Sequence, residues 1–336
     1  MSSRLQPTTN SAARGFPAAP ISWFHFCASH ELDRKPVRLE LGGREFVGYR
    51  TQSGRAVILA GRCSHMGANL ANGTVNGERL VCPLHGWEYG ANGACEKIPE
   101  TETIPTFARQ CSYPVEERGG HVFFFNHSRA RFPLPFFEGT QSDQLLAAQP
   151  FELMADVPWY FIGANGFDVQ HFRMAHDRIL MGEPQVSSPS PFARQIVATY
   201  EVTGNSTWDR ITRRIAGSRV TMSVTAWCGS MLFVRAEFAR TTSFGLFNVL
   251  PIDASRTRGR VIVWVKRSGN PLGQNLFDPI NAWIRRIFIR TFLQSDLPRI
   301  AGLRYQPSNL IPADRTLAEY FEWLETVAEP SSLENL

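Results

Sequence analysis

The first third of the chain is a series of short hydrophobic runs separated by turns. The clearest runs are residues 38–41, 45–49, 56–60 and 121–125. The turns next to them are Gly42-Gly43, Ser53-Gly54 and Gly119-Gly120. Short β-forming runs bounded by such turns are typical of antiparallel strands. We therefore predict an all-β domain over residues 21–130, preceded at residues 1–20 by a mobile tail rich in Ser, Ala and Pro.

The second half of the chain has longer runs of Val, Thr and aromatic residues, together with helical patterns. The predicted strands are residues 195–203, 219–227, 231–239, 244–252 and 260–266, and the predicted helices lie near residues 165–176, 278–303 and 317–327. Strands joined by turns, with helices around them, predict an α+β domain with an antiparallel β-sheet flanked by helices, in a helix-grip-like arrangement. We place this domain at residues 131–336, after a connector that contains Pro133 and Pro135.

Two short motifs in the first domain each combine one cysteine with one histidine. They are Cys63-Ser-His65 and Cys82-Pro-Leu-His85. Two thiolates and two imidazoles can hold either a zinc ion or an iron–sulfur cluster. Zinc fingers usually pair two cysteines in one segment and two histidines in another, whereas here each loop mixes the two. The mixed loops favour a Rieske [2Fe–2S] centre, in which both thiolates bind one iron and both imidazoles bind the other.

A third motif lies in a helical stretch of the second domain and reads Asn165-Gly-Phe-Asp168-Val-Gln-His171-Phe-Arg-Met-Ala-His176. Two histidines and a carboxylate are the ligands of many non-haem iron sites. On a straight helix, however, residues five apart lie about 140° apart around the axis. We therefore expect the helix to break or bulge between His171 and His176 if both bind one metal. The alternative is a set of ordinary polar residues on a helix surface.

The carboxylate ligand could be Asp168 or Asp296. Asp278-Pro279 predicts a helix start, with Asp278 as the N-cap, and apolar residues then follow four apart at Ile280, Ile284, Phe288 and Phe292. Asp296 continues that row, where a carboxylate is costly unless it is paired or bound to a metal. Pro298 should kink the helix just beyond it. We predict Asp296 as the third ligand; the alternative is an aspartate that accepts hydrogen bonds from backbone donors at the helix break.

Composition narrows the class of protein. The net charge of +5 is carried mainly by scattered arginines, a pattern that gives little support to nucleic-acid binding. No apolar run is long enough to cross a membrane, and no Gly-rich nucleotide motif occurs, so a redox enzyme of this sequence must receive its electrons from another protein. Four cysteines follow no paired spacing and have no assigned role, which suits a cytoplasmic protein; they are Cys27, Cys95, Cys111 and Cys228.

Together these motifs resemble the oxygenase component of the Rieske non-haem iron oxygenases over nearly the whole chain. The resemblance implies a [2Fe–2S] cluster held by Cys63, His65, Cys82 and His85, and a mononuclear Fe(II) held by His171, His176 and Asp296. It also implies a ring of subunits, commonly a homotrimer. In such a ring Asp168 would be the electron-transfer bridge, hydrogen-bonded to His171 and to the partner subunit's His85.

Within this family, residues 63–110 resemble the ketosteroid hydroxylases, cholesterol desaturases and aminopyrrolnitrin oxygenase. The resemblance implies an O₂-dependent monooxygenase that receives electrons from NAD(P)H through a separate ferredoxin or reductase. Its expected substrate is a bulky, largely apolar small molecule, which it would hydroxylate, N-oxygenate or desaturate. The alternative from another class is a Rieske electron-transfer protein without oxygenase activity.

Overall fold

The computed structural model describes residues 15–328. These residues form two compact units, one of residues 21–134 and one of residues 15–20 together with residues 135–328. The first fourteen residues of the predicted tail lie outside the described residues. The segment that follows them is packed, because the Phe16 ring stacks on Tyr160 with centroids 4.3 Å apart and the Trp159 indole donates to the Pro17 carbonyl.

The first unit consists of three small antiparallel sheets. One has the order β1-β11-β10, the second β2-β3-β4-β9 and the third β5-β6-β7-β8. The strands are β1 (Trp23–Ala28), β2 (Val37–Leu41), β3 (Arg44–Arg50), β4 (Ala56–Ala60), β5 (Thr74–Asn76), β6 (Arg79–Val81), β7 (Glu88–Tyr89), β8 (Cys95–Lys97), β9 (Ser112–Tyr113), β10 (Val115–Arg118) and β11 (His121–Phe125). The prediction of an all-β first domain is confirmed, and two of its strands, β4 and β11, have the predicted bounds.

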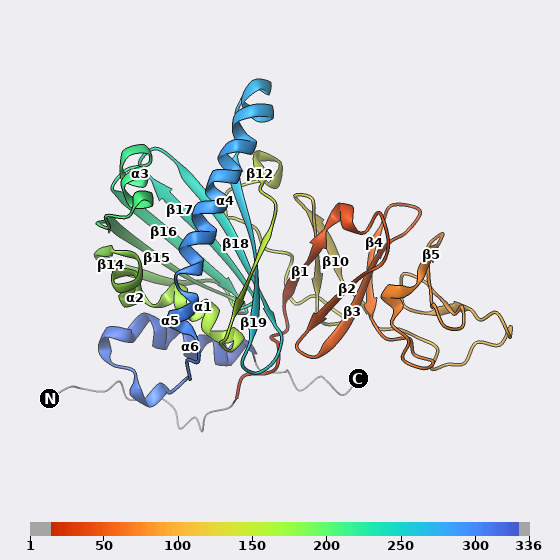
Figure 1. The fold of residues 1–336 in the computed structure, drawn as a ribbon. Helices are drawn as coiled ribbons and strands as arrows, with labels where there is room; N and C mark the ends of the chain where they lie inside the picture. The colour runs from red at the N-terminus through yellow and green to blue at the C-terminus, as the bar shows by residue number, and fades with distance from the viewer. Residues whose placement is uncertain (1–14, 329–336) are drawn as a thin grey trace. The chain divides into compact units, whose positions relative to one another are not determined.

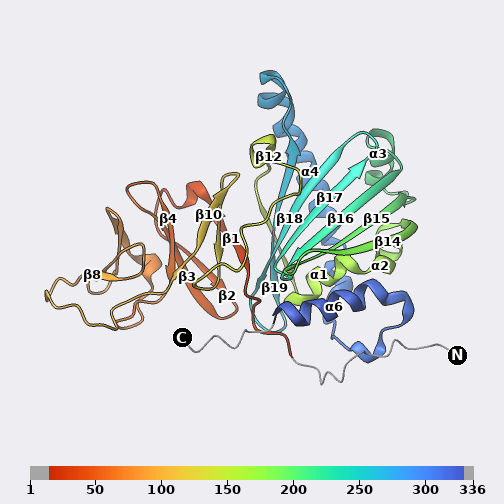
Figure 2. The ribbon, with the colours of Figure 1, turned by 180° about the vertical axis from the view of Figure 1, so that it is seen from behind.

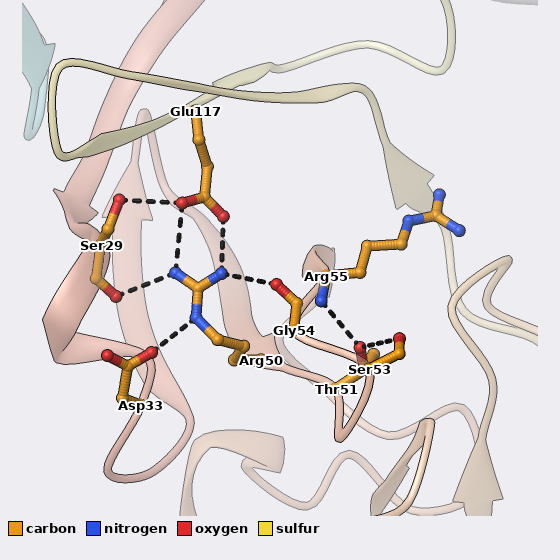
Figure 3. Close-up of polar contacts among 8 residues, drawn as sticks. All are labelled: Ser29, Asp33, Arg50, Thr51, Ser53, Gly54, Arg55 and Glu117. Atoms are coloured by element: carbon orange, nitrogen blue, oxygen red, sulfur yellow. Dashed lines mark hydrogen bonds and ion pairs between the residues drawn. The ribbon is translucent and has the colours of Figure 1, made fainter.

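A partly buried arginine links separate parts of this unit. Arg50, at the end of β3, donates to Glu117 on β10 at 2.7 Å and to the Ser29 carbonyl at 3.0 Å (Figure 3). Its Nε lies 2.6 Å from Asp33, and its Nη1 also donates to the Gly54 carbonyl at 2.9 Å. Since a guanidinium offers five donors in one plane, a single side chain can hold these four segments together.

The second unit contains a long, strongly twisted antiparallel sheet (Figures 1 and 2) with the order β12-β19-β18-β17-β16-β15-β14, and β13 also pairs with β19. Its strands are β12 (Leu145–Ala147), β13 (Phe151–Ala155), β14 (Arg178–Ser190), β15 (Ala193–Val202), β16 (Arg219–Trp227), β17 (Met231–Phe238), β18 (Thr242–Pro251) and β19 (Thr257–Lys266). The predicted antiparallel sheet flanked by helices is therefore confirmed. The predictions missed β12, β13 and β14.

Helices cover one face of this sheet and one of its ends. They are α1 (Trp159–Phe167), α2 (Val169–His176), α3 (Thr207–Ile215), α4 (Asp278–Gln294), α5 (Leu297–Ile300) and α6 (Arg315–Ala328). Helix α4 runs along one face of the sheet, whereas α1 and α6 lie side by side near one end of it (Figures 1 and 2). The Phe167 ring of α1 stacks on Tyr320 of α6 with centroids 4.4 Å apart. None of the helices in the described residues is long and apolar enough to cross a membrane.

The start of α4 differs from the prediction. Asp278 is not its N-cap, because a π-helical turn over Gly273–Phe277 continues the helix backwards, and the Asp278 carboxylate instead accepts from the backbone and hydroxyl of Ser268. The prediction that the apolar residues four apart on this helix all face the core is also only half right. Ile280 and Ile284 are exposed, since the first half of α4 extends past the edge of the sheet (Figure 1), while the second half packs on the sheet.

Candidate functional site

The two cysteine–histidine motifs fold into equivalent loops. Cys63 lies between β4 and β5, and Cys82 lies between β6 and β7. Each cysteine donates its backbone N–H to the carbonyl five residues further on, at 2.9 and 2.8 Å, and accepts from the glycine four residues further on. These glycines, Gly67 and Gly86, have φ angles of 72° and 69°. Left-handed backbone is easy for glycine and costly for other residues, so the glycines shape both turns.

Within these loops the thiols are buried and the imidazoles are exposed. Cys63 and Cys82 are 4% and 3% exposed, whereas His65 and His85 lie at the loop tips with ring centroids 4.7 Å apart. Burial raises the pKa of the Cys82 thiol, and the neighbouring Cys63 raises it further against the lowering effect of two backbone N–H groups. A bound metal would favour the thiolates that this environment otherwise disfavours. The Tyr89 hydroxyl lies 3.0 Å from Cys63 Sγ.

The arrangement of these four side chains does not match a single zinc site. Ligand atoms around a single tetrahedral zinc, with bonds of about 2.0–2.3 Å, all lie within about 4 Å of one another. Among the described residues, the only group of three or more Cys, His, Asp or Glu with all ligand atoms within 4.8 Å of one another is a different one. The four loop side chains therefore do not converge as a single zinc site requires.

That convergent group is His171, His176 and Asp296, the three residues predicted to hold a mononuclear metal. His176 Nε2 lies 3.0 Å from Asp296 Oδ1, yet the geometry does not allow a hydrogen bond between them. His171 Nε2, His176 Nε2 and Asp296 Oδ1 are all buried atoms without a hydrogen-bond partner in the described structure. Buried polar atoms are nearly always satisfied, so three unsatisfied acceptors facing one point fit a metal cation.

Neighbouring groups fix the orientation of each of these side chains. His171 Nδ1 donates to the Asp168 carbonyl at 2.6 Å, which leaves the Nε2 lone pair free to bind a metal. Burial lowers the pKa of His171, so the neutral ring is favoured. The Phe292 ring stacks on His176 with centroids 3.7 Å apart. Asp296 Oδ2 accepts from the Asn165 side chain at 3.2 Å.

Three predictions about these residues need comment. The expected break between His171 and His176 is wrong, because both lie on the continuous helix α2; the chain breaks before it, at Asp168, and after it, at Asp177 with a φ of 52°. Asp296 lies between α4 and α5 as predicted, and no backbone donor caps it. The Asp168 carboxylate accepts from the backbone N–H groups of Gln170 and His171, and so caps α2.

A cavity opens directly beside this group. It has a volume of about 190 Å³ and is lined by the sheet, α1, α2 and the second half of α4, with His171 and Asp296 in its wall. Nearly all other lining residues are apolar. A larger and more open hollow in the first unit, near Trp23 and Arg55, contains no such group of ligands. The apolar cavity beside His171 and Asp296 is therefore the candidate substrate site.

Sequence comparison identifies the first unit. A family model described as "Rieske [2Fe-2S] domain" matches residues 22–108. The chain carries a Rieske domain. Its curated relatives include aminopyrrolnitrin oxygenase PrnD of Pseudomonas fluorescens, 40% identical over 46% of this chain and 45% of that protein, and cholesterol 7-desaturase of Ciona intestinalis, 33% identical over 48% and 35%. The oxygenase component of 3-ketosteroid-9-alpha-monooxygenase of Rhodococcus rhodochrous is 34% identical over 31% and 27%. The predicted resemblance to these three groups is confirmed, and the Rieske chain spans less than half the length of each.

Solved structures extend the likeness to both units. Dicamba monooxygenase bound to dicamba has a TM-score of 0.72 at 15% identity, over 94% of this chain and 98% of that one. NdmA of Pseudomonas putida CBB5 with caffeine has a TM-score of 0.69 at 21% identity, over 90% and 89%. Over nine-tenths or more of its length, the chain therefore shares the fold of dicamba monooxygenase and NdmA.

Sequence reasoning missed several residues that shape the site. Asn165 was noted as part of a motif but not as a partner of Asp296, and Phe292 was predicted only as a core residue. Arg178 was not predicted at all. It donates to the His176 carbonyl at 2.7 Å and pairs with Asp209 at 2.8 Å, and so fastens the end of α2. Asn165 and Arg178 are near the histidines in the sequence, but only the fold shows which groups their side chains contact.

Proposed function

We propose that this protein is a terminal oxygenase that hydroxylates, N-oxygenates or desaturates a largely apolar small molecule. The observation that carries the proposal is the convergence of three unsatisfied buried acceptors, on His171, His176 and Asp296, at the wall of an apolar cavity. Two histidines and one carboxylate with open positions are typical of non-haem Fe(II) oxygenases. The names of the relatives, an oxygenase, a desaturase and a monooxygenase component, agree with this chemistry.

A mononuclear Fe(II) bound by these side chains would supply O₂ activation, with electrons delivered through a [2Fe–2S] cluster on Cys63, His65, Cys82 and His85. The protein's own contribution is to hold the ligands in place. Asp168 fixes the tautomer of His171 through its carbonyl, and Asn165 orients Asp296. The apolar walls exclude water from the cavity, which protects a reactive site from side reactions.

Electrons would come from NAD(P)H through a separate ferredoxin or reductase, since the sequence has no nucleotide-binding motif. We further propose a cytoplasmic homotrimer in which the Asp168 carboxylate contacts the partner subunit's His85. Its role as a helix cap leaves one carboxylate oxygen without a hydrogen bond to a described residue. Cys63, Cys82, Cys95 and Cys111 form no disulfide bond, which suits a reducing compartment. Light scattering after gel filtration should give the mass of three chains.

The metal content provides the first experiment. Purified protein should contain three iron atoms and two acid-labile sulfides per chain, with the visible spectrum of a Rieske centre. Zinc without sulfide would disprove the cluster assignment. Because the two metal sites use different residues, the Asp296→Ala variant should retain its sulfide and lose one iron per chain.

Activity separates an oxygenase from an electron-transfer protein. With a surrogate reductase and a substrate, wild-type protein should consume O₂ in step with product formation, and Asp296→Ala should not. Asp143→Ala, a change at an exposed position, serves as the matched control and should leave O₂ consumption unchanged. If substrate-dependent O₂ consumption survives in Asp296→Ala, the mononuclear site is wrongly assigned. If wild-type protein accepts electrons but never consumes O₂ with any substrate, the electron-transfer alternative holds.

A further inference from the structure

The first half of α4, together with the π-helical turn before it, carries its large apolar side chains on the outside. The residues buried in this segment are small or polar, namely Gly273, Asp278 and Ala282. Six large apolar residues are instead 45–67% exposed: Leu272, Leu276, Phe277, Ile280, Trp283 and Ile284. A helix on the surface of a soluble domain normally has the reverse arrangement, with its apolar side chains facing the core.

These six residues form one continuous stripe, called here the α4 stripe. They follow one another at intervals of three or four residues, and residues at these intervals are neighbours on the surface of a helix. From Leu272 to Ile284 the stripe is roughly 18 Å long. Single exposed apolar residues are common on proteins, whereas a contiguous apolar patch marks a surface that binds something.

The surroundings of the α4 stripe are basic. Residues 266–294 contain five basic residues and one acidic residue, Asp278, whose buried carboxylate accepts from Ser268. Three of the basic residues are exposed and form no ion pair with a described residue: Lys266, Arg267 and Arg290. One exposed carboxylate is near them, on Asp143, next to the Gln144 whose carbonyl accepts from the Arg267 backbone. It balances one charge at most, so the region stays positive.

The basic surface continues from α4 onto α3. The turn between β17 and β18 contacts both helices, because Arg240 donates to the Arg214 carbonyl of α3 at 2.8 Å and the Thr242 carbonyl accepts from Arg285 of α4 at 3.2 Å. Helix α3 lies at the same end of the sheet as the first half of α4 (Figures 1 and 2). It too exposes apolar and basic side chains: Arg210, Ile211, Arg214 and Ile215.

The carboxylates beside α3 are already neutralised. Residues 203–252 contain two acidic residues, Asp209 and Glu237. Asp209 pairs with Arg178 at 2.8 Å, and Glu237 pairs with Arg235. The arginines that α3 exposes are therefore not balanced by these groups, and the surface fits a partner that is both anionic and apolar.

An anionic lipid bilayer has both properties. Helices that lie on membranes bury Trp, Phe and Leu side chains at the boundary between headgroups and acyl chains, while Lys and Arg beside them attract the anionic headgroups. A protein partner needs a groove shaped to the helix, whereas a bilayer accepts a helix that projects from its domain. The subunit contact proposed for Asp168 leaves the stripe uncovered, because α1 and α2, which flank Asp168, lie towards the other end of the sheet (Figures 1 and 2).

We propose that the first half of α4, with the exposed side of α3 beside it, binds the surface of an anionic phospholipid membrane. The α4 stripe enters the headgroup region, and the exposed Lys and Arg side chains contact lipid phosphates. The protein then lies on the membrane without crossing it. This binding does not depend on the proposed oxygenase activity.

Sedimentation of the full-length, metal-loaded protein with lipid vesicles tests the proposal. Vesicles of equal parts phosphatidylglycerol and phosphatidylcholine should bind the protein at least about tenfold more tightly than vesicles of phosphatidylcholine alone. Raising the ionic strength from about 0.1 M to about 1 M should weaken that binding, because the screening length falls from about 10 Å to about 3 Å. Protein that binds neither kind of vesicle, or both equally, would overturn the proposal.

A first pair of variants tests the apolar contact. Ile280→Gln should weaken binding to the anionic vesicles by about tenfold or more, because the burial of the isoleucine side chain in lipid is lost. Met154→Gln is the matched control, since Met154 of β13 is 51% exposed and Ile280 is 49% exposed. This control should bind as wild type does. Equal effects of the two changes would contradict the assignment to α4.

A second pair of variants tests the charge. Arg290→Gln should weaken binding about fivefold, the effect of one basic residue beside an anionic surface. Arg304, between α5 and α6, is also exposed and has no ion pair with a described residue. Arg304→Gln removes the same charge elsewhere and should bind as wild type does. If both changes weaken binding equally, the attraction comes from the net charge of the protein, and the assignment to this surface is wrong.

Light scattering without vesicles separates a membrane from a second copy of this chain as the partner of the α4 stripe. Wild-type protein and Ile280→Gln should have the same mass in solution. A lower mass for Ile280→Gln would show that the stripe joins copies of the chain, and would overturn the membrane proposal while leaving the oxygenase proposal intact.

Discussion

Replacing Asp296 with asparagine should change the stability of the protein in opposite directions with and without iron. The carboxylate is 4% exposed and receives one hydrogen bond, from the uncharged Asn165 amide, while Oδ1 faces His176 Nε2 without bonding to it. A buried charged group left partly unsatisfied costs about 1–3 kcal/mol or more. Asparagine has nearly the same shape, keeps the contact with Asn165 and carries no charge.

Without iron, Asp296→Asn should therefore be more stable than wild type by about 1–2 kcal/mol. For a unit of this size that difference raises the melting temperature by about 2–8 °C. With Fe(II) at a hundred times its dissociation constant, wild type should gain about 2.7 kcal/mol from binding. The variant lacks the charged ligand and should gain much less, so the order of stability reverses.

The assay is thermal unfolding of both proteins followed by circular dichroism, without oxygen and at about pH 8, where an ordinary imidazole is neutral. Each protein is measured after removal of the mononuclear iron and again with Fe(II) added. Asp278→Asn is the control. Asp278 is also buried but accepts two hydrogen bonds from Ser268, which lower its pKa, so this variant should be destabilised in both conditions. The reasoning is refuted if iron-free Asp296→Asn is less stable than wild type, or if Fe(II) raises both melting temperatures equally.

Three further predictions concern other parts of the structure. Arg50→Lys should lower the free energy of unfolding of the Rieske domain by about 1–2 kcal/mol in urea titrations, because an ammonium group cannot reach all of the partners of the guanidinium. Gly67→Ala should reduce the [2Fe–2S] content measured by sulfide assay, because left-handed backbone costs a residue with a Cβ about 1–2 kcal/mol; Gly67→Asn should retain more cluster. For Asp209, burial raises the pKa, but hydrogen bonds from Ser206 and Arg178 outweigh it and lower the pKa below its ordinary 3.8. Its contribution to stability is therefore complete above about pH 4 and is lost as the pH falls further, so Asp209→Asn should flatten the dependence of unfolding free energy on pH in that acid range.

The strands that the sequence predicted with the correct bounds are rich in buried apolar residues: β4 and β11 are buried almost throughout, and β16 is buried on one face. β16 has the predicted bounds, because its residues alternate between the core and the opposite side of the sheet. β14 was missed because its thirteen residues are mostly exposed and include Pro184 and Pro189. It is an edge strand whose pairing with β15 is irregular, and proline is tolerated at such edges. Hydrophobic alternation, which reports burial, contains no signal for a strand of this kind.

At the candidate metal site, the sequence identified the two histidines but did not predict correctly how the helix brings them together. His171 and His176 were found from their spacing, yet the inference that a helix between them must break was wrong. That inference treated side chains as points on a cylinder. Helical side chains lean towards the N-terminus, so the ring of His176, the last residue of α2, can lean back towards His171. Their ring centroids are 5.4 Å apart. Angular position on a helix therefore excludes contact only for short side chains.

What the sequence could not predict is the space between the elements. The two cysteine–histidine loops and the pair His171 and His176 are local in the sequence, because short segments supply metal ligands at little cost in chain entropy. Asp296, in contrast, lies 120 residues beyond His176. The cavity is lined by residues from six strands and four helices, among them Gly245, where an added Cβ would meet no atom within 4 Å. A glycine in a strand usually marks a weak point or a close approach of two backbones. Here no atom approaches it, so Gly245 leaves open space in the cavity wall, and the shape of that space depends on residues that are far apart in the sequence.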